Sequence, residues 1–203
     1  LMRDLGVNNL DHRLQQTDFR DQAGQPVMPS SSLRYAELEE QNNILLLGCN
    51  IHREVPLAGV RVNKAYRNGA KVSAINPVDY DYHFAITDKV IASPQDMPMQ
   101  IACLVLALVK DPSLLPAEVQ KLLLGLEPST AIRAIADQLR DTNATIVTGA
   151  LCENHPDAAL LRTLVSLLEE LSGARVLRLT TGSNSAGAWL AGMVPHRKEA
   201  GKS

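Results

Sequence analysis

Apolar runs and helical patterns alternate along the middle of the chain. An apolar run at 44–47 precedes a helical pattern at 56–67, and a second apolar run follows at 71–75. Pro56 suits the first turn of that helix, and Gly69 suits its end. A strand, a helix and a second strand in this order form a βαβ unit. We therefore expect two parallel strands here.

The same order returns in the second half of the chain. A strand at 144–148 precedes a leucine-rich helix that ends before Gly173, and a last strand is expected at 175–179. Elsewhere the pattern predicts one short strand at 89–92. It also predicts helices at 33–40, 96–110, 116–124 and 129–140. This alternation predicts an α/β fold, a doubly wound, mostly parallel, Rossmann-like sheet with helices on both faces. The expected strand order is 3-2-1-4-5.

The length of 203 residues fits one domain. We expect residues 1–203 to form a single α/β domain, with 1–32 as an irregular lead-in and 198–203 as a flexible tail. The chain begins Leu1-Met2, which suggests an internal fragment. A net charge of −2 and an aromatic content of 3% favour no nucleic-acid partner. The apolar runs are too short to span a bilayer, so no direct membrane insertion is expected.

A glycine follows the strand in each half of the chain, and these glycines indicate a binding crevice. In open α/β sheets, ligands bind at the carboxyl ends of the strands, where the strand order reverses. We therefore predict that Gly48, Cys49, Asn50 and Gly149 bind a cofactor through a cradle of backbone N–H groups. A complete G-x-G-x-x-G is missing, and for the first loop taken alone a simple turn out of the strand is the favoured explanation of the glycine.

Two Cys-x-x-His pairs also accompany these turns. Cys49 and His52 follow the first strand, and Cys152 and His155 follow the fourth. Together they have the donor types of a zinc site, but small residues that line packed loops are the favoured interpretation, so no metal site is predicted. Four close thiolates, which an iron–sulfur cluster needs, are lacking. The odd cysteine count, with Cys103 as the third, favours a reducing compartment.

The small-residue segment from Gly182 to Gly187 contains Ser183 and Ser185. It does not match a nucleophile elbow, because the strand–Ser–helix context and a following Asp and His are missing. The sequence therefore predicts no catalytic residues. Trp189 belongs to an apolar patch that is either the edge of the core or a contact with another part of a larger protein.

Four motifs accompany the strands and helices of the first half: Leu47-Gly48-Cys49-Asn50, Pro56, Gly69-Ala70-Lys71 and Asn76-Pro77. Together they resemble the molybdopterin oxidoreductase superfamily. Three others resemble, more narrowly, the large iron–sulfur subunit (G or 75-kDa subunit) of respiratory NADH–quinone oxidoreductase, complex I. They are Asn9-Leu10-Asp11-His12-Arg13, the segment 76–81 and the segment 184–197.

The resemblance implies a scaffold and interaction domain that supports electron transfer from NADH to quinone. The full subunit would carry iron–sulfur clusters, with no cofactor in this fragment and with the other complex I subunits as partners. It would lie peripherally on the cytoplasmic side of a bacterial inner membrane, the fragment itself being soluble. Asn76-Pro77-Val78 replaces the Asp-Pro-Arg that helps to hold a pterin nucleotide in the superfamily. The alternative is a nucleotide- or molybdopterin-binding oxidoreductase domain that uses the Gly48 and Gly149 loops.

Overall fold

A parallel sheet forms the centre of the protein, whose computed structural model describes residues 2–29 and 31–202. Its five strands are β1 (Asn43–Leu47), β2 (Lys71–Asn76), β3 (Lys89–Ile91), β4 (Ala144–Thr148) and β5 (Arg175–Arg178). They lie in the order β3-β2-β1-β4-β5, and every pair is parallel. The predicted fold class and strand order are confirmed.

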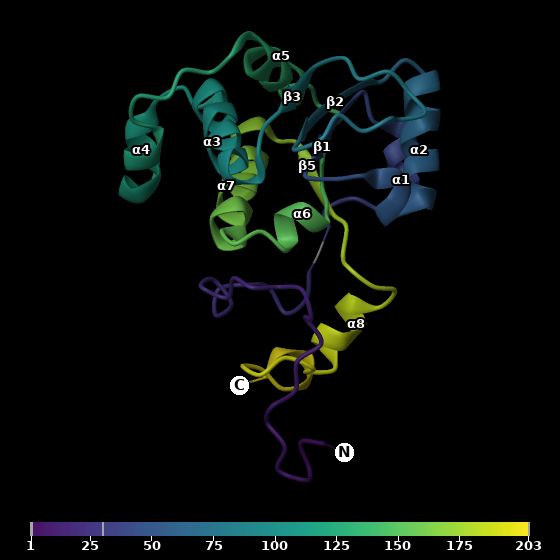
Figure 1. The fold of residues 1–203 in the computed structure, drawn as a ribbon, viewed down its shortest axis with the longest axis vertical. Coiled ribbons are helices and arrows are strands. Elements are labelled where there is room, and N and C mark those ends of the chain that lie inside the picture. The colour runs from purple at the N-terminus through teal and green to yellow at the C-terminus, as the bar shows by residue number, and fades with distance from the viewer. Residues whose placement is uncertain (1, 30, 203) are drawn as a thin grey trace.

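Helices cover both faces of the sheet (Figure 1). One face carries α1 (Ile51–Glu54), α2 (Pro56–Arg67) and the 3-10 helix η1 (Tyr35–Glu40). The other face carries α3 (Met97–Leu108), α5 (Thr130–Leu139) and α7 (Ala158–Ser172), with α4 (Ala117–Leu123) beside α3. The remaining short helices are α6 (Ala150–Glu153), α8 (Ser185–Leu190), η2 (Pro94–Asp96), η3 (Pro112–Leu114) and η4 (Glu199–Gly201).

The central strands are buried on both faces, which explains their continuous apolar runs. Every residue of β1 and β4 is buried. Successive side chains point to opposite faces, so Leu45 and Ile146 join the core under α3, α5 and α7, while Leu46 and Val147 join the core under α2. The two apolar cores fix the register of the sheet.

The structure differs from the predicted elements mainly where helices are short. The helix expected at 33–40 is a 3-10 turn over Tyr35–Glu40, and α1, α6 and α8 have no counterpart in the prediction. Stretches of four to six residues are too short to show a helical period. The helix expected at 96–110 ends at Leu108, because Val109 already has an extended backbone.

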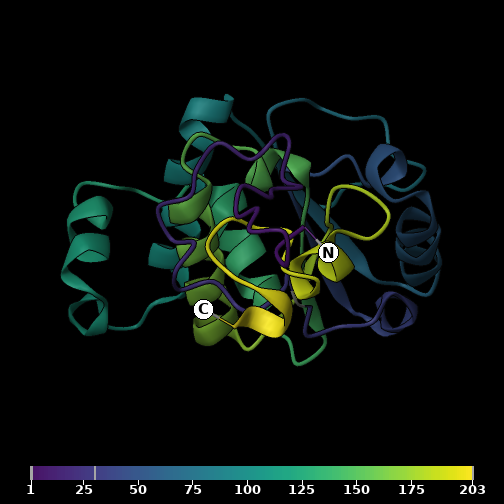
Figure 2. The ribbon, with the colours of Figure 1, turned by 90° about the horizontal axis from the view of Figure 1, so that it is seen from below.

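The two ends of the chain lie together across the carboxyl edge of the sheet (Figures 1 and 2). We call residues 2–29 the N-terminal segment and residues 179–202 the C-terminal segment. Arg3 donates to the carbonyls of Gly192, Val194 and Arg197. In return, Arg197 donates to the carbonyls of Gln25 and Pro26. Within the described residues, no helix combines the length and apolar character that a bilayer span needs.

Asp18 joins the N-terminal segment to the start of α7. Its carboxylate accepts hydrogen bonds from the side chain and the backbone N–H of Arg20. It also accepts one from the backbone N–H of Ala159, at 2.8 Å. Its side chain is 3% exposed. Hydrogen bonds from Arg20 lower the pKa of Asp18 well below its usual range.

Asp18→Asn is expected to destabilise the protein by about 2 kcal/mol, because it removes charge-assisted hydrogen bonds from a buried position. The pKa of Asp18 is lower in the folded protein than the ordinary carboxyl value of about 3.9. Asp18 therefore stabilises the folded protein fully when the pH is above that ordinary value, and this stabilisation is lost as the pH falls through the lowered pKa. Urea unfolding of the wild type and the variant, at neutral pH and at about pH 3, measures both effects. The single tryptophan, Trp189, reports the docking of the two segments. Asp81→Asn, at an exposed position, is the control, and an equal loss in both variants would contradict this role of Asp18.

Candidate functional site at the carboxyl edge of the sheet

The reversal of strand order lies between β1 and β4, and two glycine turns meet there. Gly48 follows β1 with a φ of 56°, a conformation that favours glycine. Gly149 follows β4, and a Cβ atom on it would lie 2.6 Å from both the Cα of Cys49 and the carbonyl oxygen of Gly48. The two loops are therefore in direct backbone contact, and this contact leaves no room for a side chain at Gly149.

A carboxylate from the chain itself joins the two loops. One oxygen of Glu54 accepts from the backbone N–H of Asn50, and the other accepts from that of Ala150, each at 2.7 Å. The neighbouring N–H of Cys49 donates to the side-chain oxygen of Asn76, also at 2.7 Å. Glu54 thus occupies two of the donors that a bound anion would use in a cradle of this kind.

The predicted cofactor-binding residues lie together at this point. Gly48, Cys49, Asn50 and Gly149 form the two turns, and Cys49 is fully buried. The hydroxyl of Tyr82 donates to the carbonyl of Cys49 at 2.8 Å, and burial raises the pKa of Tyr82, which keeps it protonated. That these four residues contact a cofactor stays a prediction.

The two Cys-x-x-His pairs do not form a common ligand set. Burial raises the pKa of the Cys49 and Cys152 thiols, so both stay protonated at neutral pH. His52 accepts from the backbone N–H of His83, and both ring nitrogens of His155 have backbone partners. Among the described residues, no group of three or more His, Cys, Asp or Glu side chains could hold a metal ion.

A cavity of about 450 Å³ has Glu54 in its wall, and we call it the edge crevice. Its volume is within the usual range for small-molecule sites. The loop after β5 forms one wall, and the N-terminal segment forms another. Its lining residues are His12, Leu14, Gln15, Glu54, Ala150, Leu179, Thr180, Thr181 and Gly182. The crevice lies at the edge of the sheet where α/β proteins of this topology bind ligands.

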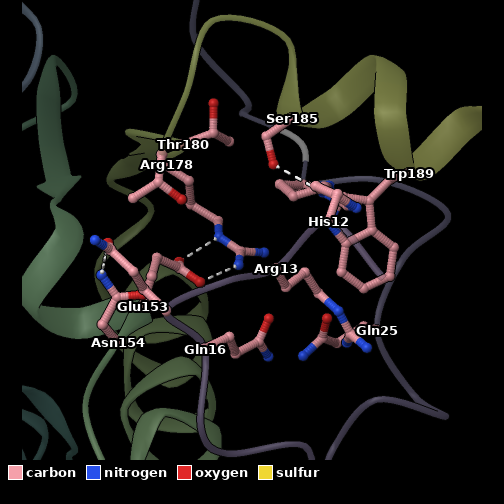
Figure 3. Close-up of a pocket in the computed structure, with 13 residues that line it drawn as sticks. His12, Arg13, Gln16, Gln25, Glu153, Asn154, Arg178, Thr180, Ser185 and Trp189 are labelled. Carbon is pink, nitrogen blue, oxygen red and sulfur yellow. Dashed lines mark hydrogen bonds and ion pairs between the residues drawn. The ribbon is translucent and has the colours of Figure 1, made fainter. Parts of the chain in front are cut away.

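A smaller cavity of about 60 Å³ adjoins the crevice, and we call it the side recess (Figure 3). The two cavities share His12, Gln15, Thr180 and Thr181. The side recess also contains Arg178, which forms two hydrogen bonds with Glu153 at 2.9 and 2.8 Å.

His12 and Ser185 meet at the wall of the side recess (Figure 3). The Nε2 atom of His12 lies 3.2 Å from the Oγ atom of Ser185, and Nδ1 lies 2.8 Å from the carbonyl oxygen of Met193. Trp189 is 4% exposed and packs edge-on against the ring of His12. The apolar patch predicted around Trp189 thus covers the joint between the two segments.

The sequence prediction missed Glu54, His12 and Ser185 as site residues. For Glu54 a signal exists, since an acidic residue four positions after Asn50 can reach back to the start of a helix. His12 and Ser185 are 173 positions apart, and no local pattern links them. Only the packing of the two end segments brings them together.

Comparison with known proteins supports the fold alone. No family model matches the sequence, and no curated protein matches it. Among solved structures, the chain is similar to one from the formyltransferase/hydrolase complex (FhcABCD) of Methylorubrum extorquens in complex with methylofuran, with 15% identity and a TM-score of 0.51. The match covers 84% of this chain and 47% of the other, so this chain spans about half of that protein's length.

This comparison contradicts the predicted membership in complex I and its superfamily, because the matched structure belongs to a different complex. The predicted role in NADH-to-quinone electron transport and the predicted partner subunits are corrected with it. The motifs behind the resemblance have structural tasks that explain their presence. Pro56 starts α2, Asn76 binds the N–H of Cys49, and Arg197 binds carbonyls of the N-terminal segment. Such tasks specify a packing arrangement, and the comparison shows the fold alone.

Proposed function

We propose that the protein binds an uncharged or cationic polar small molecule in the edge crevice. The observation that carries this proposal is the position of Glu54. Its carboxylate lies in the wall of a cavity at the carboxyl edge of a parallel sheet, and it already accepts from the N–H groups of Asn50 and Ala150. The crevice therefore presents a negative charge where a phosphate-binding protein presents free donors.

The polar groups of the crevice suit a ligand that donates hydrogen bonds. A carboxylate has about four acceptor positions, so Glu54 keeps about two after binding the two N–H groups. Thr180 and Thr181 also line the crevice, with hydroxyls that donate and accept hydrogen bonds. The nearby cations Arg178 and Arg13 are ion-paired with Glu153 and Asp11, so the attraction for an anion is weak.

Amide resonances of the ¹⁵N-labelled protein test this proposal. We expect primary amides, ureas or amines at millimolar concentration to shift the resonances of Ala150, Thr180 and Gly182, which line the crevice. Inorganic phosphate should leave them unchanged. Thr180→Val should weaken the binding of a responding compound about fivefold, the effect of one lost hydrogen bond.

Thr163→Val is the matched control, because Thr163 lies on the exposed side of α7, outside the edge crevice, and should not change the affinity. A set of amides, ureas and amines that shifts none of the three resonances would contradict the proposal. A response to phosphate in their place would contradict the ligand class.

A further inference from the structure

The geometry points to Ser185 as a nucleophile that His12 activates, and we propose that the protein hydrolyses small uncharged acyl esters. This inference rests on the proposed binding of an uncharged polar molecule in the edge crevice. It adds a reaction to that site, and it uses residues of the adjoining side recess.

The hydrogen bonds of His12 fix its tautomer. A carbonyl oxygen only accepts hydrogen bonds, so the contact between Nδ1 and the carbonyl of Met193 at 2.8 Å places a proton on Nδ1. In the neutral ring, Nε2 then carries a lone pair, and this atom lies 3.2 Å from the Oγ of Ser185. The serine hydroxyl donates to Nε2, which is the arrangement of a nucleophile and its general base.

Packing holds both side chains in place. The backbone N–H of His12 donates to the same carbonyl of Met193, so main chain and ring are anchored together. Ser185 is the first residue of α8, and Trp189, one turn later, packs against the ring of His12. His12 lines both cavities and Ser185 lines the side recess, so an ester bound in the crevice can place its acyl group at Ser185.

Arg13 is a charged neighbour of the Ser185 site that packing holds in place. Its side chain is 4% exposed and lies over the rings of Phe19 and Trp189. Two of its nitrogens bind Asp11, while the buried Nη1 has no hydrogen-bond partner in the part of the chain that the structure describes. Arg13 lines the same recess as Ser185, and its ion pair with Asp11 keeps it in place beside His12 and Trp189.

The reaction balances without a further reagent except water. The Oγ of Ser185 forms a bond to the carbonyl carbon, and its proton passes to Nε2 of His12. The bond from carbon to the leaving oxygen then breaks, and that oxygen takes the proton from His12. Water attacks the acyl-serine in the same way and releases the acid and free Ser185. The volume of the side recess, about 60 Å³, restricts the acyl group to a short one.

A fluorophosphonate probe on the full 203-residue chain tests this proposal, with the adduct located by mass spectrometry. We expect one adduct, on Ser185, which Ser185→Ala abolishes. His12→Gln should slow labelling at least about 100-fold, the usual contribution of a general base. Ser183→Ala is the matched control, since Ser183 is an exposed serine of the same loop, and should label like the wild type. An adduct elsewhere, an adduct that persists in His12→Gln or no adduct at all would overturn the proposal.

Cysteine substitution gives a second measurement that does not need the probe to fit the recess. Ser185→Cys should react with iodoacetamide at least about tenfold faster than Ser183→Cys, because a neighbouring base raises the thiolate fraction. Cys49, Cys103 and Cys152 are buried and contribute little background. Equal rates at the two positions would overturn the proposal. If neither Ser185 nor Ser185→Cys reacts while the resonances of Thr180 and Gly182 still shift with ligands, the hydrolysis proposal is refuted and the binding proposal stands. If Ser185 reacts while no ligand shifts those resonances, only the binding proposal is refuted.

Discussion

Gly149→Ala is expected to destabilise the protein by about 3 kcal/mol, because the new methyl group has no space. It would lie 2.6 Å from the Cα of Cys49 and 2.6 Å from the carbonyl oxygen of Gly48. Both are backbone atoms, so no side chain can rotate away. The backbone of Gly149 itself is extended, with φ −111° and ψ −172°, and any residue can adopt it. The effect is therefore one of space between the two loops, measurable by urea or thermal unfolding.

Gly24→Ala is the matched control for this prediction. A Cβ atom at Gly24 meets only the carbonyl oxygen of Asp21, at 3.6 Å, an ordinary van der Waals contact. Gly24→Ala should change the free energy of unfolding by no more than about 0.5 kcal/mol. If Gly149→Ala were as mild as Gly24→Ala, the direct contact between the β1 and β4 loops would be contradicted.

Glu54→Ala is expected to cost about 2 kcal/mol of stability, since it removes two charge-assisted hydrogen bonds at a half-buried position. The N–H groups of Asn50 and Ala150 would lose their acceptor. Because these groups follow different strands, the variant should also loosen one loop against the other. Urea unfolding measures the loss of stability, and hydrogen exchange at Asn50 and Ala150 measures the local opening.

Glu54→Gln separates charge from size in the same experiment. A carboxamide has one acceptor oxygen, so it can serve one of the two N–H groups and turns an NH₂ group toward the other. We expect it to be about as destabilising as Glu54→Ala. Glu127→Ala, at an exposed position, is the control for removal of a surface carboxylate and should be nearly neutral. A wild-type-like Glu54→Gln would show that the carboxylate does not join the two loops.

The sheet could be predicted from the sequence because its strands are buried on both faces. Their apolar runs, such as 44–47 and 144–148, need no alternation to be recognised, and a glycine follows each. The strand order follows from two βαβ units that share one sheet. These local signals placed the two glycine turns at the carboxyl edge.

The contents of the site could not be predicted in the same way. The partner of Glu54 in the β4 loop, Ala150, is 96 positions away, and Ser185 is 173 positions from His12. Both contacts depend on how irregular segments pack over the sheet, and apolar periodicity does not describe such segments. The motifs that suggested complex I include Arg13 and Arg197, and in the structure these side chains bind the end segments together. A packing motif can thus resemble a family without indicating its chemistry.

The carboxylate of Glu54 occupies the two backbone donors that an anionic ligand would need. The amide resonances of Asn50 and Ala150, followed during titration with acetate and with inorganic phosphate, test whether these two donors are occupied. In the wild type we predict that neither anion moves them, because Glu54 already binds both N–H groups at 2.7 Å. In Glu54→Ala, acetate should move both resonances as it replaces the missing carboxylate. If both anions moved these resonances in the wild type as strongly as in Glu54→Ala, the occupation of the two donors by Glu54 would be contradicted.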